Sequence, residues 1–508
     1  MHPLGSLRLA SLLGLLATAA PAAVQASPFR HGIRANNQTD PLIECLTEAG
    51  VPVDEAGTED YRLDVSTFNL RLNYTPAAVV GASTAEHVRD AVACAARTGV
   101  KTTAKCGGHS YASFGLGGED GHLVIEMSRM NEVVLDTETG IATVQGGTRL
   151  GHLAVELWDQ GKRAISHGTC PGVGVGGHAL HGGYGMSSHT HGLALDWIVG
   201  ATVVLANGTV VEASETENPD LFWALRGAGS SMGVVTEFRF NTFQPPENLT
   251  YFVVSVQWTT EERALSGLAA VQEFAKTMPA ELNMRVYITS RFVNLEGLYY
   301  GDKAGLEETL APLIEQVNGV LALAQTGSWL DQLKHYGGSN LDQGYGHEEH
   351  ENFHSTSLYT HELSEAQLQS FVGYWFNSAK NNTRNWHVQI DLHGGENSGV
   401  AVGDRDISGV PSAYAHRDFL LMFLLYDRSD RGAFPDDGTA SMDDFAAAIT
   451  DGLEPDQWGM YINYPNPLLD QAAAQQSYWG PNLARLQAIK KEVDPDDLFH
   501  YPQGVLPA

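Results

Sequence analysis

Two reactive side chains stand in glycine-rich segments of this sequence. His109 lies in the run KCGGHSYASFG, and Cys170 lies in the run GTCPGVGVGGHALHGG. Glycine reaches backbone conformations that other residues avoid, so such segments let backbone N–H groups approach a phosphate closely. An imidazole and a thiol in two loops of this kind have the chemistry to hold a phosphate-bearing cofactor covalently at two points.

The second segment also contains a nucleotide-binding pattern. Gly172, Gly174 and Gly177 satisfy G-x-G-x-x-G, which in a dinucleotide-binding unit follows a strand and opens a helix. Here no clear strand precedes the pattern and no ordinary helix follows it. We therefore interpret the loop as backbone lying flat against a planar ligand rather than as an NAD site.

Four histidines follow the same loop, namely His178, His181, His189 and His191. Their spacing permits metal binding, but no H-E-x-x-H pattern or interleaved carboxylate accompanies them. We expect histidines with hydrogen-bond partners, no bound metal, and a contact between His178 and the cofactor.

The elements that must position these loops form an α+β pattern. Apolar residues recur at helical spacing over 84–98, and a short strand over 100–104 runs directly into Cys106. Strands are predicted from residue 250 onward in TYFVVSVQW, NMRVYITSR, LEGLYYG, WHVQIDL and DFLLMFLLYD. Helices are predicted between them over 260–277, 303–318, 365–380 and 441–450. We expect a large antiparallel sheet with helices on one face, followed by a helix over 482–493 that leads back to the first part.

Charge and the N-terminus limit the partners and the location. Of the 508 residues, 60 are Asp or Glu and 30 are Lys or Arg, so the surface repels nucleic acids and anionic membranes. Arg8, an apolar run over 9–20 and a small-residue cleavage site predict a signal peptide over 1–26 and a secreted protein. Glycosylation sequons agree with this route, at Asn37, Asn73, Asn207, Asn248 and Asn381.

Four cysteines are present, and an oxidising compartment permits a disulfide between two of them. We favour Cys45 with Cys94, because Cys94 lies on the predicted helix over 84–98, which can pack against the segment around Cys45. Pairing of Cys106 with Cys170 is the alternative. In the favoured arrangement Cys106 is a buried thiol that behaves as a small hydrophobic residue.

Eight motifs occur in an order that resembles one enzyme family. They are KCGGHSY, GTCPGVGVGGH, GYG, GLALDWI, NPDLFWALRGAGSSMGVV, YAHRD, YINY and NLARLQAIKKEVDPDDLF. The set resembles the FAD-linked oxidases of the berberine-bridge-enzyme type, and among them the fungal gluco-, xylo- and chito-oligosaccharide oxidases. The resemblance implies an FAD-binding domain over 27–245, a substrate domain over 246–458, and a segment over 459–508 that returns to the FAD domain.

The resemblance also implies roles for individual residues. His109 bonds the 8α carbon of FAD, and Cys170 bonds C6. Val173 is small enough to leave room for O₂ beside the flavin, so H₂O₂ is the expected by-product. The further cofactor contacts implied are Gly107, Gly108, Ser110, Gly174, Gly177 and His178.

Oxidation of an alcohol also needs a group that takes the hydroxyl proton. Tyr464, in YINY, matches the family's base, and Asp391, in VQIDL, matches its partner. A tyrosine has a pKa of about 10, and a neighbouring carboxylate raises that pKa further, so Tyr464 is expected to relay the proton to Asp391. The implied reaction converts the anomeric C1 hydroxyl of a reducing-end oligosaccharide to a lactone. Substrate contacts are expected at Tyr111, Arg285, Gln389 and Trp386.

Two other functions are compatible with the sequence. One is a secondary-metabolite oxidase on the same scaffold, acting on an alkaloid or a phenol. The other is a secreted carbohydrate-binding glycoprotein that retains the scaffold without the activity. In each case we expect a monomer that binds neither nucleic acid nor membrane.

Overall fold

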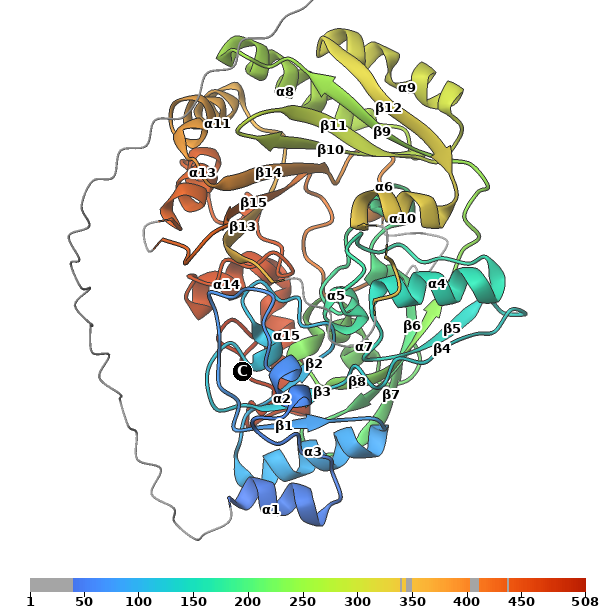
Figure 1. Ribbon diagram of the computed structural model, residues 1–508, viewed down its shortest axis with the longest axis vertical. Coiled ribbons are helices and arrows are strands. Elements are labelled where there is room, and N and C mark those ends of the chain that lie inside the picture. The colour runs from blue at the N-terminus through green and yellow to red at the C-terminus, as the bar shows by residue number, and fades with distance from the viewer. Residues whose placement is uncertain (1–39, 339, 344–349, 403–410, 436–437) are drawn as a thin grey trace, which may run out of the picture. The chain divides into compact units, whose positions relative to one another are not determined.

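A small parallel sheet carries the loop that contains His109. The structure is a computed structural model that describes residues 40–338, 340–343, 350–402, 411–435 and 438–508. Strand β3 (Leu123–Glu126) lies between β1 (Ala78–Gly81) and β2 (Thr102–Lys105), and both neighbours run parallel to it (Figure 1). The loop with His109 begins where β2 ends, as the sequence predicts.

A disulfide joins the first helix to the helix beside this sheet. Helix α3 (Ala85–Thr98) matches the predicted helix, because Thr84 caps its first turn and Gly99 ends it with a φ of 71°. Cys94 of α3 is bonded to Cys45 of α1 (Pro41–Glu48), with the two Cα atoms 5.7 Å apart. The favoured cysteine pairing is confirmed.

A five-stranded antiparallel sheet forms the second layer of this part of the chain. Its order is β4-β5-β8-β6-β7. The strands are β4 (Val133–Leu135), β5 (Ile141–Gln145), β6 (Ile198–Val204), β7 (Val210–Ser214) and β8 (Val234–Asn241). Helices α4 (Leu150–Gly161) and α7 (Pro219–Ala228) share one hydrophobic core with this sheet, so the sheet is covered rather than solvated on that face.

The largest sheet has eight antiparallel strands in the order β12-β9-β11-β10-β14-β15-β13-β16. The strands are β9 (Leu249–Val256), β10 (Leu282–Thr289), β11 (Val293–Tyr299), β12 (Gly319–Gly327), β13 (Asn352–Thr360), β14 (Asn385–Leu392), β15 (Leu421–Ser429) and β16 (Trp458–Gly459). One face is covered by helices α8 (Glu261–Thr277), α9 (Lys303–Gln316), α11 (Glu365–Asn377) and α13 (Ala440–Thr450). The predicted antiparallel sheet with helices on one face is confirmed.

Three strands of this sheet and helix α10 (Trp329–Gly337) have no counterpart in the sequence prediction. The segment of β12 is rich in Leu and Ala, which favour helix locally, but pairing with β9 makes it a strand. The segment of β13 is rich in buried Ser, Thr and His and shows no alternation, yet β15 and β16 enclose it. For both segments, pairing with strands distant in the sequence determines that they form strands.

The C-terminal segment is anchored by a buried ion pair. Helix α15 (Leu483–Val493) follows α14 (Gln471–Trp479) and matches the predicted helix over 482–493. Lys490 Nζ lies 2.6 Å from Asp494 Oδ2 and donates to the carbonyl of Ser231 at 2.9 Å. Because Ser231 belongs to the glycine-rich loop after α7, this pair joins the end of the chain to the part that contains the five-stranded sheet.

Short helical pieces complete the described chain. They are α2 (Glu59–Asp64), α5 (Val175–Ala179), α6 (Ser188–His191) and α12 (Gly399–Val402), with 3₁₀ turns η1 (Phe114–Leu116), η2 (Ala194–Trp197), η3 (Gly229–Ser231), η4 (Ala379–Asn381) and η5 (Gly480–Asn482). No helix among the described residues has the length and apolar character to cross a bilayer.

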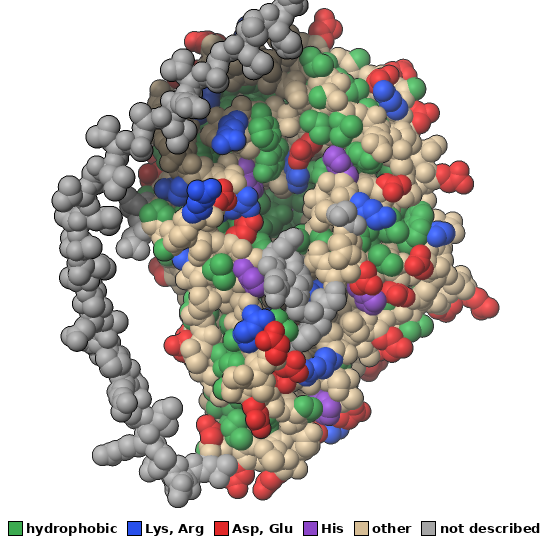
Figure 2. Space-filling view, in the orientation of Figure 1, with side chains coloured by type: hydrophobic (Ala, Val, Ile, Leu, Met, Phe, Trp, Pro, Cys, Tyr) green, Lys and Arg blue, Asp and Glu red, His purple; other side chains and the backbone are tan. Residues whose placement is uncertain are grey.

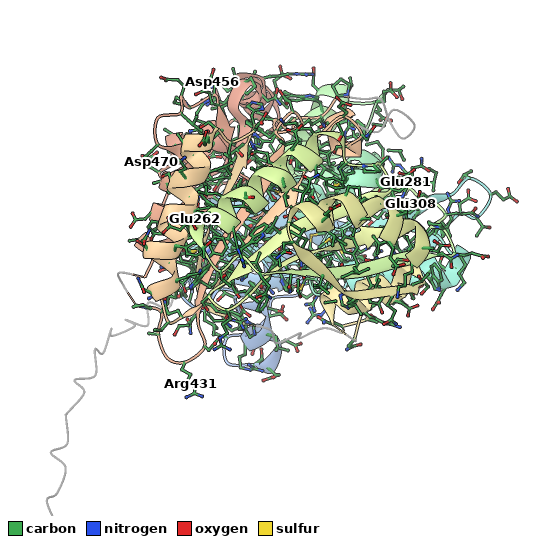
Figure 3. All side chains as sticks on the ribbon, turned by 90° about the horizontal axis from the view of Figure 1, so that it is seen from above. Glu262, Glu281, Glu308, Arg431, Asp456 and Asp470 are labelled. Atoms are coloured by element: carbon green, nitrogen blue, oxygen red, sulfur yellow. A yellow bond between two sulfur atoms is a disulfide. The ribbon has the colours of Figure 1, made fainter. Side chains whose placement is uncertain are left out.

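The acidic excess lies on the surface. Asp and Glu side chains are spread over the face seen in Figure 2, and Figure 3 labels exposed examples at Glu262, Glu281, Glu308, Asp456 and Asp470. Four of the sequon asparagines are exposed, at Asn73, Asn207, Asn248 and Asn381. Asn37 and the predicted signal peptide lie outside the described residues.

Candidate active site

The two glycine-rich loops touch each other through their backbones. A Cβ atom on Gly107 would collide with the carbonyl oxygen of Gly172 and the nitrogen of Gly174, and a Cβ on Gly174 would collide with Cys106 Sγ. The loop before α5 is further fixed by a backbone hydrogen bond from Val175 to Thr148 (2.8 Å). Glycine is therefore required at both contact positions.

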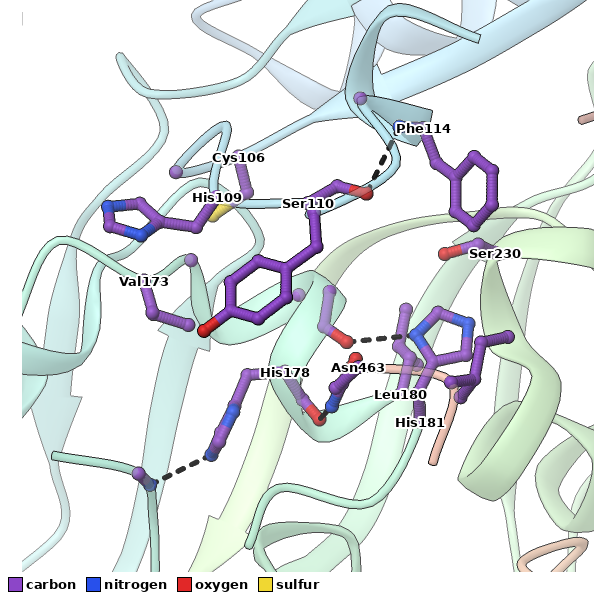
Figure 4. Close-up of a pocket in the computed structure, with 18 of the residues that line it drawn as sticks. Cys106, His109, Ser110, Phe114, Val173, His178, Leu180, His181, Ser230 and Asn463 are labelled. Carbon is purple, nitrogen blue, oxygen red and sulfur yellow. Dashed lines mark hydrogen bonds between the residues drawn. The ribbon is translucent and has the colours of Figure 1, made fainter. Parts of the chain in front are cut away.

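A cavity of about 480 Å³ opens beside this contact. Its lining includes all the sequence-predicted cofactor contacts, namely Gly107, Gly108, His109, Ser110, Cys170, Val173, Gly174, Gly177 and His178. It also includes the predicted catalytic pair and three of the predicted substrate contacts, namely Tyr464, Asp391, Tyr111, Arg285 and Gln389. Residues far apart in the sequence thus surround one space (Figure 4). A hollow with hydrophobic side chains is visible beneath the large sheet in Figure 2.

The walls of the cavity fit a flat, polar cofactor. A Cβ on Gly177 would meet no atom within 4 Å, so the backbone there faces open space. His181 donates through Nδ1 to the Gly177 carbonyl (2.8 Å), while its buried Nε2 has no hydrogen-bond partner. A buried polar atom without a partner on a cavity wall indicates a ligand that completes its hydrogen bonds.

The imidazole of His109 is held by an aromatic ring. The ring of Phe68 stacks on it with centroids 4.6 Å apart and an interplanar angle of 22°. In the following residues, Ser110 Oγ accepts a hydrogen bond from the backbone of Phe114 (3.1 Å), which fixes the turn after His109. No sequence pattern pointed to Phe68, because it precedes the loop by a long stretch and meets His109 only in the folded chain.

The other histidines near the loop are neutral. His178 Nε2 accepts a hydrogen bond from the backbone of Gly168 (2.9 Å), and burial lowers the pKa of this histidine to about 3. Burial lowers the pKa of His181, His189 and His191 to about 4 in each case. Nowhere in the described ranges are three His, Cys, Asp or Glu side chains grouped to hold a metal ion.

The large sheet contributes a group of coupled polar side chains. Gln389 Nε2 donates to Asp391 Oδ2 (2.7 Å), and Arg285 Nε donates to Glu296 Oε1 (2.7 Å). Burial raises the pKa of Asp391 to about 6, although Arg285 and Gln389 act in the opposite direction. Asp391 is therefore ionised at neutral pH but close to the range in which it takes up a proton.

Tyr464 lies between this group and the loops. Its ring stacks against Tyr111 with centroids 5.7 Å apart and an interplanar angle of 20°. Burial raises the pKa of Tyr464 well above 10, and the nearby Tyr111 and Asp391 raise it further. A neutral phenol in this position can pass on a proton but does not lose one to solvent.

Trp386 does not contact the cavity, so its prediction as a substrate contact is wrong. It is 1% exposed and packs among the residues between the large sheet and its helices, near Phe445. Successive side chains of a strand point to opposite faces, so Trp386 faces away from Gln389 and Asp391. The same alternation places His387 on the cavity and, on β10, adds Tyr287 to Arg285. The alternation of side chains along a strand could have been read from the sequence for Trp386, His387 and Tyr287 alike.

Comparison with family models defines the class of protein. A model described as an FAD binding domain matches residues 76–214, which include both glycine-rich loops. A second model, described as berberine and berberine like, matches residues 460–506, which include Tyr464. The chain is therefore a flavoprotein with a berberine-type C-terminal segment.

Individual relatives cover almost the whole chain. The xylooligosaccharide oxidase of Thermothelomyces thermophilus is 49% identical over 97% of this chain and 99% of that protein. The solved structure of the xylooligosaccharide oxidase from Myceliophthora thermophila C1 with xylobiose has a TM-score of 0.90 at 49% identity, covering 92% of this chain and 100% of that chain. A structure of glucooligosaccharide oxidase from Acremonium strictum, with a 6-S-cysteinyl, 8α-N1-histidyl FAD, has a TM-score of 0.88 at 43% identity with the same coverage. This chain belongs to the berberine-bridge-enzyme-like family of FAD-linked oxidases.

The contact between the loops predicts the effect of a single methyl group. Gly107→Ala should destabilise the protein by about 3 kcal/mol, since backbone atoms on both sides must move, and should reduce the amount of bound flavin. The measurement is the ratio of flavin to protein absorbance in purified protein, together with the melting temperature. Gly115→Ala is the control, because its Cβ would lie 3.5 Å from Lys105 Cγ on the wall of the same cavity. Native flavin content and melting temperature in Gly107→Ala would contradict the loop contact.

Proposed function

We infer that this chain is an oligosaccharide oxidase that holds FAD through two covalent bonds, from His109 to the 8α carbon and from Cys170 to C6. The observation that carries the proposal is that one cavity is lined by both of these side chains and by Tyr464 and Asp391. The similar glucooligosaccharide oxidase has FAD bonded to a cysteine and a histidine. The similar xylooligosaccharide oxidase was solved with xylobiose.

FAD held by these residues would supply a two-electron acceptor for the hydride of the sugar C1, with O₂ as the final oxidant and H₂O₂ as the by-product. The residues of the chain manage the proton. The phenolic oxygen of Tyr464 receives the proton of the C1 hydroxyl while its own proton passes to the carboxylate of Asp391. The product is the lactone of the reducing-end sugar. The half-buried Tyr464 never has to exist as a free phenolate, which its high pKa would not permit.

The remaining cavity residues are assigned by position. Tyr111 offers a ring beside Tyr464, and Gln389 and Arg285 offer hydrogen-bond donors to sugar hydroxyls. Val173 leaves the flavin accessible to O₂. The flavin contacts proposed are Gly107, Gly108, Ser110, Gly174, Gly177 and His178. In this assignment the FAD domain comprises 27–245 and 459–508, and the substrate domain comprises 246–458.

Secretion and a monomeric state are part of the proposal. The Cys45–Cys94 disulfide supports an oxidising compartment, and the four exposed sequons are accessible for glycosylation. The predicted signal peptide over 1–26 supplies the route.

Peroxide release tests the substrate class directly. Purified flavoprotein is assayed with cellobiose, xylobiose, chitobiose, lactose and a phenolic alcohol. We expect release with at least one reducing sugar and loss of that release when C1 carries a methyl group, because the C1 hydroxyl is the group oxidised. Turnover of the phenol with no response to any sugar would instead support the secondary-metabolite oxidase.

Covalent attachment predicts a stepwise loss of flavin. His109→Ala and Cys170→Ala should each keep flavin bound after acid precipitation through the other bond, and the double variant should release it. The measurement is flavin absorbance in the supernatant and in the redissolved protein. Complete release of flavin from either single variant would contradict attachment at two residues.

The pKa of Asp391 predicts the acidic limit of the reaction. Its carboxylate accepts the proton relayed by Tyr464 only when ionised, so kcat should fall about tenfold for each pH unit below about 6. Asp391→Asn should lower kcat by about 10²-fold or more and remove this limb of the pH profile. Tyr464→Phe should lower kcat similarly without loss of flavin. An unchanged pH profile in Asp391→Asn would exclude Asp391 as the acceptor.

A further inference from the structure

A row of stacked rings crosses the cavity face of the large sheet. Tyr287 of β10 stacks with His387 of β14 at 5.0 Å and 25°, and His387 stacks with Tyr426 of β15 at 5.0 Å and 22°. Tyr426 in turn stacks with Phe353 of β13 at 4.5 Å and 22°. Since β10, β14, β15 and β13 are consecutive neighbours in the sheet, the row is continuous.

The row ends at an exposed ring. Phe292, in the turn between β10 and β11, stacks with Tyr287 at 6.2 Å and 26°. It is 49% exposed, whereas Tyr426 and Phe353 are buried. Within the described residues Phe292 has this one ring neighbour, while Tyr287 and His387 each have two. The interior rings use their faces on one another, and Phe292 keeps apolar surface free for a ligand.

The turn that carries Phe292 is held in place. Thr289 Oγ1 accepts a hydrogen bond from the backbone of Phe292 (3.0 Å), and the backbone of Thr289 donates to the carbonyl of Phe292 (3.0 Å). A half-exposed phenylalanine in a fixed turn has little rotational freedom to lose on binding, which favours its use as a contact surface.

The positions along β10 set the distance from the reacting groups. Arg285 is paired with Asp391, and Tyr287 lies two residues further along the strand, about 7 Å away. Phe292 lies opposite Thr289, the last residue of β10, at the start of β11 and further along this direction than Tyr287. Moving away from Asp391 along this direction, a ligand therefore passes Tyr287 and His387 first and Phe292 after them.

The row is also uncharged. Burial lowers the pKa of His387 to about 3, and the positive charges of Arg285 and Arg428 lower it further. His387 is thus a neutral aromatic ring at any pH at which the protein is expected to work. Neutral rings beside a few polar groups are the usual lining of a site for an uncharged ligand with apolar faces.

We propose that Phe292 forms a distal subsite that stacks on the third sugar ring of an oligosaccharide whose reducing end lies at Tyr464 and Asp391. The proposal rests on the oligosaccharide oxidase function and adds that the enzyme prefers chains of at least three sugars. The C–H face of a pyranose covers the free surface of Phe292, the second ring lies beside Tyr287 and His387, and a disaccharide does not reach Phe292.

Chain-length dependence tests this subsite. The variants Phe292→Ala and Phe292→Trp are compared with the native holoenzyme on xylobiose, xylotriose and the corresponding cello-oligosaccharides. In Phe292→Ala we expect kcat/KM for the trisaccharides to fall about fivefold to tenfold through KM, with the disaccharides changed by less than about twofold, because only the third ring loses buried apolar area. Phe292→Trp should restore the preference.

A matched control uses an exposed residue on another strand. Val320 is 67% exposed on β12, the edge strand that β9 and β11 separate from β10. Val320→Ala should therefore leave kcat/KM unchanged for both disaccharides and trisaccharides. An equal loss on disaccharides and trisaccharides in Phe292→Ala, or no loss on either, would overturn the subsite.

Binding measurements with ligands that cannot be oxidised test the subsite independently of the oxidase function. Calorimetry with the methyl β-glycosides of xylobiose and xylotriose, which are blocked at C1, should show tighter binding of the longer ligand to native protein but not to Phe292→Ala. Equal affinities in the native protein would overturn the proposal. Phe292-dependent binding without oxidation of any sugar would overturn the oxidase function and leave the subsite standing.

Discussion

The contact between two glycine backbones determines where the chemistry takes place. Gly107 follows the parallel strand β2, whereas Gly172 and Gly174 precede helix α5, and a side chain on either loop would separate them. Backbone hydrogen bonds from Leu150 to Val173 (2.9 Å) and from Val175 to Thr148 (2.8 Å) hold the second loop against the start of α4. As a result, two nucleophilic side chains that are 61 residues apart (170 minus 109) face one cavity.

The large sheet supplies the other wall through strand alternation. On β14, one face packs Val388 and Ile390 against the covering helices, and the opposite face presents His387, Gln389 and Asp391 to the cavity. The hydrophobic face provides the burial that holds the strand rigidly, and that rigidity keeps the polar groups in register with the loops. A site built on strands in this way is positioned more firmly than one built on loops alone.

The C-terminal segment connects the two walls. The hydroxyl of Tyr461 accepts hydrogen bonds from the backbones of Gly183 (2.8 Å) and Tyr184 (3.1 Å), and Asn463 Nδ2 donates to the carbonyl of His178 (3.2 Å). Tyr464, which follows them, is therefore tied to the segment after the cysteine loop while its side chain stands among residues of the sheet. Burial acts on the two walls in opposite senses: it lowers the pKa of His178 to about 3, which keeps this imidazole neutral, and raises the pKa of the Asp391 carboxyl to about 6.

The sequence by itself determined the features that depend on neighbours along the chain. These are the two loops, the helix that carries Cys94, the strand period that places Gln389 and Asp391 together, and the motifs of the family. Only the tertiary structure decided which strands become neighbours and which face of each is covered. The helix-favouring segment of β12 and the polar segment of β13 are strands because of their partners, and Trp386 is buried because helices cover its face. Phe68 reaches the cavity, and the ring row forms, through contacts between distant segments, which no local pattern records.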